Sequence, residues 1–345
     1  MASSFVKALC RQECRRPLPN MTGMKNTKTT TSILLLTALA NLSALPAAYA
    51  APVTITGEAT VKYERDRADG EPAVSGTMST VKLTAEGEMS SGWYWYARLA
   101  AQQATQPALA DFNIGAYASG TKSVAALDQF GFVRKAGSFT YKLGRQDVSI
   151  GTEALLYKRN HENVGRHNFV DGLTVGGKAG ATDLALTAAR EDNEAGRENG
   201  TVYALRAGWQ TSEKAGWGLT WGRYQSSSTG STNQWAVDGK YEFGKHSLSA
   251  QYTQSDAASD NKGYVVNWIY DFDGKTALYL TGFRRETAAA MGDQSEFDGG
   301  HKGFYYGLTH QLSKDTGLEI LYKDQRQLAD GAKNNKLEAK ISHSW

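Results

Sequence analysis

Few side chains in this 345-residue sequence are spaced for catalysis or metal binding. His161 precedes Glu162, and Asp298 lies three residues before His301; such pairs supply the base of a hydrolase when their side chains converge. Nearby residues on a strand or loop point apart as often as together, so neither pair is a catalytic signature. The spacing of six between His161 and His167 matches no recognised metal-ligand motif. We therefore predict no enzyme, no metal and no cofactor.

The thiols and the excess positive charge both lie at the start of the chain. Cys10 and Cys14 are the two cysteines, and the first 50 residues also hold 6 of the 38 Lys and Arg but 1 of the 35 acidic residues. From Ala51 onward there are 32 basic and 34 acidic residues, a net charge of −2. Disulfide, thiolate-metal and cysteine-nucleophile chemistry are excluded for that part, and no basic footprint for nucleic acid is present.

Residues 24–50 have the organisation of a secretory signal peptide. Two lysines near the start are followed by an apolar run from Ile33 to Leu45 and a small-x-small cleavage site ending at Ala50. The alternative is a short transmembrane anchor, but the apolar run is shorter than the ~20 residues that a spanning helix needs. Residues 1–23 lack this organisation, and we predict a mis-assigned or unstructured extension there.

From residue 51 onward, hydrophobicity alternates with a period of two over runs of about ten residues, the length with which a tilted strand crosses a bilayer. The sixteen runs lie near 53–64, 79–89, 93–103, 127–136, 138–147, 168–178, 181–191, 201–211, 217–226, 233–243, 246–256, 262–272, 275–286, 302–312, 317–327 and 336–345. Their connections alternate between short and long. This predicts an all-β fold, a transmembrane antiparallel meander β-barrel of about 16 strands with short periplasmic turns and longer external loops. An even strand count lets the last strand pair with the first.

The two faces of the runs differ in polarity. In the last run, Leu337 and Ile341 share one face, while Lys336, Glu338 and Lys340 share the other. A packed sheet sandwich could not bury these charges, whereas a water-filled lumen solvates them. A barrel of about 16 strands is wide enough to leave an aqueous channel.

Three segments resemble one family. Residues 130–146 end in Leu-Gly-Arg-Gln, residues 307–316 read Gly-Leu-Thr-His-Gln-Leu-Ser-Lys-Asp-Thr, and the chain ends at Trp345. They are similar to segments of the general porins of Gram-negative bacteria, which are trimeric 16-stranded diffusion channels. The resemblance implies a homotrimer in the outer membrane, in contact with lipid and lipopolysaccharide. It also implies that the barrel-assembly machinery reads Trp345 and that the solutes are small and hydrophilic.

The resemblance further implies that the connection 148–167 folds into the lumen and narrows it. It lacks the Pro-Glu-Phe-Gly-Gly turn of many porins, and the alternative is a solvated loop over the mouth. Strict alternation turns Arg145 outward, and we expect a bulge at Gly144 to turn it into the lumen instead. The predicted constriction and lumen-wall residues are Arg98, Lys142, Arg145, Glu153, Lys158, Arg159, His161, Glu162, Arg166 and His167.

We therefore predict a porin for passive diffusion of ions and small hydrophilic solutes. The alternative is a substrate-specific sugar or anion channel, with Tyr94 and Tyr96 as the start of an aromatic track; a barrel enzyme or an adhesin is less favoured. Connection 148–167 carries three cationic side chains against two acids. This favours a mild anion preference that strengthens as pH falls through ~6.5, where His161 and His167 gain charge.

Overall fold

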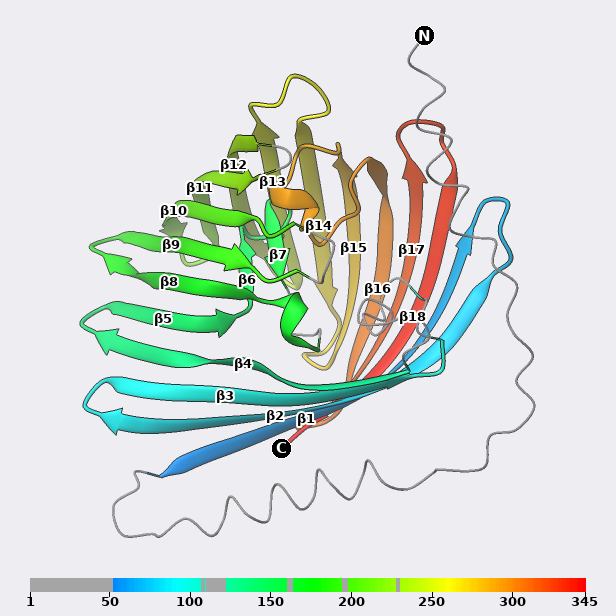
Figure 1. Ribbon diagram of the computed structural model, residues 1–345. Coiled ribbons are helices and arrows are strands. Elements are labelled where there is room, and N and C mark those ends of the chain that lie inside the picture. The colour runs from blue at the N-terminus through cyan, green and yellow to red at the C-terminus, as the bar shows by residue number, and fades with distance from the viewer. Residues whose placement is uncertain (1–51, 107–108, 110–121, 160–163, 194–197, 228–229) are drawn as a thin grey trace, which may run out of the picture. The chain divides into compact units, whose positions relative to one another are not determined.

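The computed structural model describes residues 52–106, 109, 122–159, 164–193, 198–227 and 230–345. The predicted extension (1–23) and signal peptide (24–50) lie outside these residues. The strands form one closed antiparallel barrel in which each strand pairs with its neighbours along the chain and the first pairs with the last (Figure 1). The predicted fold class is therefore confirmed.

Sixteen strands make the barrel. They are β1 (Val53–Ala68), β2 (Val74–Ser90), β3 (Trp93–Ala104), β4 (Ser123–Ala136), β5 (Phe139–Gln146), β8 (Val170–Ala179), β9 (Thr182–Glu191), β10 (Thr201–Ser212), β11 (Ala215–Ser226), β12 (Gly230–Phe243), β13 (His246–Ser255), β14 (Lys262–Asp271), β15 (Thr276–Arg285), β16 (His301–Ser313), β17 (Thr316–Gln327) and β18 (Lys333–Ser344). A separate two-stranded sheet pairs β6 (Val148–Ile150) with β7 (Tyr157–Arg159). Two short 3-10 helices are η2 (Arg166–Asn168) and η3 (Met291–Asp293). In the part of the chain that the structure describes, no helix is long and apolar enough to span a membrane.

Each predicted run corresponds to one barrel strand, but several strands are longer than their runs. The added residues lie toward the long connections: β1 continues to Ala68 and β2 begins at Val74. Arg65 and Arg67 in the added part of β1 are exposed. The backbone ladder continues there, but the apolar alternation that identifies a strand stops where the outer face meets water instead of lipid.

The ladder confirms the predicted division of faces. Val61 pairs with Ile341 across the β1–β18 seam, and these side chains are 55% and 49% exposed on the outer surface. Lys62 and Lys340, one residue further along each strand, pair on the inner face. An apolar outer band with a charged interior is the pattern of a barrel that spans a bilayer around water.

Aromatic side chains gather near the short turns. They include Trp93, Phe139, Trp209, Trp217, Phe243, Phe272 and Trp345. Trp209 and Trp217 face each other across a turn with ring centroids 4.5 Å apart. Trp345 extends the β1–β18 seam, because its backbone exchanges two hydrogen bonds with Gly57 (3.0 and 3.1 Å). Such rings suit the membrane interface, where an apolar body and a polar edge are both satisfied.

Candidate functional site

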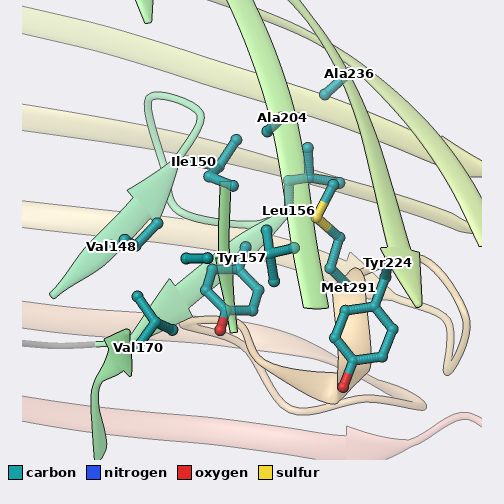
Figure 2. Packing of buried hydrophobic residues seen from close by; sticks show 11 residues of the cluster. Val148, Ile150, Leu156, Tyr157, Val170, Ala204, Tyr224, Ala236 and Met291 are labelled. Atoms are coloured by element: carbon teal, nitrogen blue, oxygen red, sulfur yellow. The ribbon is translucent and has the colours of Figure 1, made fainter. Parts of the chain in front are cut away.

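The described part of the connection between β5 and β8, residues 148–159 and 164–167, folds into the barrel, as predicted. We call residues 148–167 the constriction loop. Leu155, Leu156 and Tyr157 have 0% exposure, although they lie between polar segments. Figure 2 shows Leu156 and Tyr157 among apolar side chains of the barrel wall that include Ala204 and Ala236. Burying Leu156 and Tyr157 holds the loop against the inner faces of β9–β12, at roughly 1.5–3 kcal/mol for each large side chain.

Glu191, at the end of β9, anchors the middle of the constriction loop. Its carboxylate is 2% exposed. It accepts hydrogen bonds from the hydroxyls of Tyr157 (3.0 Å) and Tyr224 (2.9 Å), and it pairs with Arg159 (3.2 Å). Arg159 also donates to the His167 carbonyl oxygen (2.7 Å). Because both charges are buried and shared among several partners, this cluster fixes β7 rigidly to the wall.

The first turn of the constriction loop has two further anchors on the wall. The Thr152 hydroxyl donates to Asp238, which also pairs with Arg206. The side-chain oxygen of Gln251 accepts from the backbone N–H of Glu153 at 3.1 Å. Gly151 (φ +93°) precedes this turn, and a Cβ there would lie 2.1 Å from the Gln251 amide, so glycine is required.

Asp128 anchors the returning end of the constriction loop. Arg98 pairs with Gln129 and the next residue pairs with Leu127, so Asp128 is an extra residue of β4 and forms a bulge. Its fully buried carboxylate receives two hydrogen bonds from Arg98 (2.8 and 2.9 Å) and one from the Gly165 N–H (3.0 Å). Arg98 therefore holds the loop through Asp128.

A second connection also folds inward, which the sequence did not predict. We call residues 286–300, between β15 and β16, the second inward segment. The Met291 N–H donates to the Leu156 carbonyl oxygen (2.9 Å), and the Ser295 hydroxyl donates to the Leu155 carbonyl oxygen (2.9 Å). The Glu296 N–H donates to the Ala154 carbonyl oxygen of the constriction loop (3.3 Å). The two connections thus pair by backbone hydrogen bonds inside the lumen.

Leu155 gives this junction an apolar centre. It lies in one buried cluster with Phe283, Phe297 and Tyr305, and Val265 completes the set. Phe283 and Phe297 have ring centroids 4.8 Å apart, and Phe283 and Tyr305 5.1 Å. The second inward segment is therefore packed against the wall as well as against the constriction loop.

A cavity of about 680 Å³ lies between the inward connections and the opposite wall. Its charged lining from the inward connections is Glu153, Lys158, Glu296 and Asp298. From the wall the charged lining is Glu58, Lys62, Lys82, Glu319, Lys323, Lys336, Glu338 and Lys340. The loop side thus has a net charge of −2 and the wall side of +2. Low-dielectric walls strengthen such charges at a narrow section.

The wall charges form a continuous network. It runs through Asp66, Lys336, Glu64, Lys62, Glu338 and Lys323, with successive N···O distances of 3.9, 3.5, 3.1, 2.8 and 2.8 Å. Like charges stand directly opposite each other in the ladder, Lys62 with Lys340 and Glu64 with Glu338. Three of the five contacts, Lys336–Glu64, Lys62–Glu338 and Lys323–Glu338, therefore run diagonally between neighbouring strands.

Glu153 is the one acid of the constriction loop in this lining. Burial raises its pKa, and the nearby carboxylates of Asp238 and Glu296 raise it further, whereas a hydrogen bond with Ser249 lowers it. Lys158 also lines the cavity and pairs with Glu296. Among the described residues of the loop, the charged groups that line the cavity are thus one acid and one paired lysine.

The other predicted site residues that the structure describes are absent from the lining of this cavity, although Arg98 lines a second one beside Glu58 and Lys82. Arg98 and Arg159 are buried in the anchors described above, and Lys142 lies over the Tyr96 ring with its Nζ 3.6 Å from Asp147. Arg166 is exposed and donates to His167. His161 and Glu162 lie outside the described residues. Sequence position identified the loop correctly, but it did not distinguish channel-facing charges from anchoring ones.

Arg145 does not turn into the lumen. The β4–β5 and β5–β8 ladders continue past Gly144 without a shift, and Arg145 stands opposite Phe130 and Asp171. Phe130 is 43% exposed on the outer surface, and directly paired residues share a face. Arg145 pairs with Asp171 (2.7 Å) and Asp192 (2.9 Å). Gly144 (φ +132°) adds no residue to the strand, so the expected change of phase is wrong.

Comparison with known proteins supports the fold. No family model and no curated protein matches the chain. Solved structures of the porin of Rhodopseudomonas blastica do match: a triple mutant is 12% identical with a TM-score of 0.56, and a second triple mutant is 11% identical with a TM-score of 0.57. Each match covers 85% of this chain and 100% of the other.

At sequence identities this low, the structural matches show a shared fold alone. The chain is a sixteen-stranded barrel of the porin type, and the resemblance to the general porins is confirmed at the level of architecture.

Proposed function

We propose that this protein is an outer-membrane porin, a water-filled channel for passive diffusion of ions and small hydrophilic solutes. The observation that carries the proposal is the polar cavity of about 680 Å³ left between the inward connections and the charged wall of a sixteen-stranded barrel. A fixed polar lining offers water and solutes hydrogen bonds that replace those of bulk water. The free-energy barrier for a hydrophilic solute to pass the narrow section is therefore low.

The cavity favours broad selectivity. Lysines and carboxylates are equal in number among its described lining residues, six of each. Ionic interactions at distance are screened beyond ~8 Å at physiological salt, so discrimination depends on charges at the narrow section. The mild anion preference expected from the constriction loop loses its basis, because Arg159 and Arg166 do not line the cavity and Lys158 is paired.

A substrate-specific sugar channel has less support. Its aromatic track would use Tyr94 and Tyr96, but Tyr96 is 6% exposed and donates to the Arg145 carbonyl (3.0 Å). A barrel enzyme also lacks support from the acid and histidine at 298 and 301: Asp298 accepts a hydrogen bond from Gln325 (3.1 Å), and His301 contacts the Gly299 carbonyl oxygen (2.7 Å). Each side chain thus has a structural partner.

The remaining parts of the proposal concern export and assembly. Residues 24–50 act as a signal peptide, with mature chains starting at Ala51, and 1–23 are not part of the functional protein. Trp345 serves the barrel-assembly machinery, and the barrel forms a homotrimer in lipid and lipopolysaccharide. N-terminal sequencing of the outer-membrane form, with Ala51 expected first, tests the export step.

Liposome swelling tests the channel. Vesicles containing the refolded protein should swell in isotonic solutions of small sugars, at rates that fall steeply as the sugar becomes larger. Swelling in one sugar alone would favour the substrate-specific alternative, and no swelling in any would overturn the proposal.

A further inference from the structure

The second inward segment has a composition that differs from that of the constriction loop. Residues 286–300 contain four acids and no Lys or Arg, whereas residues 148–167 contain three cationic residues and two acids. By sequence, the constriction loop has a net charge of +1 and the second inward segment one of −4. A connection that projected into solvent would leave the lumen charge unaffected.

Two of these acids reach the cavity. Glu296 and Asp298 both line it, and together with Glu153 they form the acidic side that faces the wall lysines. Glu296 also pairs with Lys158 and so neutralises the one loop cation in the lining. Asp298 is held by Gln325 of the wall at 3.1 Å, which fixes its position.

The segment is held in place by more than its charges. Lys158 donates its backbone N–H to the Gln294 carbonyl (3.3 Å), and the Met291 and Glu296 N–H groups donate to the constriction loop. Arg285, 1% exposed, donates to the Phe297 carbonyl oxygen at 2.5 Å. These hydrogen bonds join the segment to the constriction loop and to the barrel wall.

We propose that the second inward segment is the selectivity element of the pore: Glu296 and Asp298 set the charge of the narrow section, and the constriction loop supplies the frame. The inference rests on the proposed channel function. It assigns ion discrimination to residues that lie more than a hundred positions after the constriction loop.

Charge-neutral, nearly isosteric replacements test the assignment. In Glu296→Gln/Asp298→Asn the lining changes from balanced to +2, and Lys158 loses its partner. In a planar bilayer with a KCl gradient, we expect the ratio of chloride to potassium permeability to rise about threefold or more, with a small change in conductance.

The matched control is Glu86→Gln/Glu88→Gln. These exposed acids of β2 lie toward the short turn and do not line the cavity, and the substitutions change the net charge equally. We expect the control ratio to stay close to that of the unsubstituted protein. Equal shifts in both variants would show that only net charge matters and would overturn the assignment.

A second measurement does not depend on charge removal. The chain after residue 50 has no cysteine, so Gln294→Cys introduces a unique thiol at the cavity surface. Cationic and anionic methanethiosulfonates should each lower single-channel conductance. The cationic reagent should shift the permeability ratio toward chloride, and the anionic reagent should shift it toward potassium.

The outcomes separate the two proposals. An unsubstituted protein that opens no conducting pathway refutes the channel itself. A conducting protein whose permeability ratio is insensitive to Glu296→Gln/Asp298→Asn and to modification at residue 294 refutes only the role of the second inward segment.

Discussion

Substitution of Glu191 should loosen the constriction loop while leaving the barrel intact. The carboxylate is the common acceptor for Tyr157, Tyr224 and Arg159, and Arg159 is 5% exposed. Removing one partner of a buried ion pair leaves an uncompensated charge and costs about 3–5 kcal/mol. The sixteen-strand ladder does not depend on this cluster, so the cost falls on loop docking. The population of undocked loop should then rise by roughly two to four orders of magnitude.

Single-channel recording and limited proteolysis measure this change. Glu191→Ala should show frequent conductance fluctuations and faster cleavage within 148–167, whereas Asp183→Ala should not. Asp183 pairs with Lys178 at the surface, where the two side chains are 47% and 66% exposed, so that pair contributes at most about 1 kcal/mol.

A double substitution separates buried charge from lost packing. Glu191→Ala/Arg159→Met removes both charges. We expect fewer conductance fluctuations than in Glu191→Ala, because replacing a whole buried ion pair by apolar groups costs little stability. A steady, protease-resistant Glu191→Ala channel would refute the anchoring argument. If the double variant fluctuates in conductance as often as Glu191→Ala, the unpaired buried charge is not the cause of the loosening.

Three further predictions concern other residues. Burial raises the pKa of Glu153, so lowering the pH should neutralise it before exposed glutamates are protonated and should shift reversal potentials toward anions; Glu153→Gln should remove that part of the titration. Lys158→Glu should shift the permeability ratio toward cations with little loss of thermal stability. Arg159→Glu places a second carboxylate against Glu191 and should lower the temperature at which heating changes the mobility of the protein on a gel. Equal stability of the two variants would contradict the burial of Arg159. Deletion of Trp345 should reduce outer-membrane levels strongly while periplasmic export continues, and Trp345→Phe should retain most of the protein; normal levels of the deletion variant would exclude an assembly role.

The fold was predictable because a lipid-facing strand must alternate. Each predicted run became a barrel strand, and the charged faces of β1 and β18 line the lumen. The ends of strands were less predictable, as with β1 beyond residue 64, since strand residues outside the bilayer have no apolar requirement.

The site was predictable in position more than in detail. Spacing and family resemblance identified the constriction loop, but the roles of its charges depend on partners distant in sequence. Arg159 meets Glu191, and Arg98 meets an Asp128 that faces inward through a bulge. Nothing in the local sequence signals these encounters.

The second inward segment was missed for a related reason. Its apolar residues, such as Met291 and Phe297, are few and lie in a small polar connection that resembles an external loop. They become a core only when Leu155 and Leu156 of the constriction loop are already inside the barrel. Long-range packing of this kind has no periodic signature.

Conductance of the purified protein in a planar lipid bilayer tests the central claim most directly. A water-filled passive pore predicts discrete current steps that are linear in voltage and rise in near proportion to KCl concentration. A membrane that stays at baseline current with correctly folded protein incorporated, or a conductance that saturates at low salt, would contradict the account.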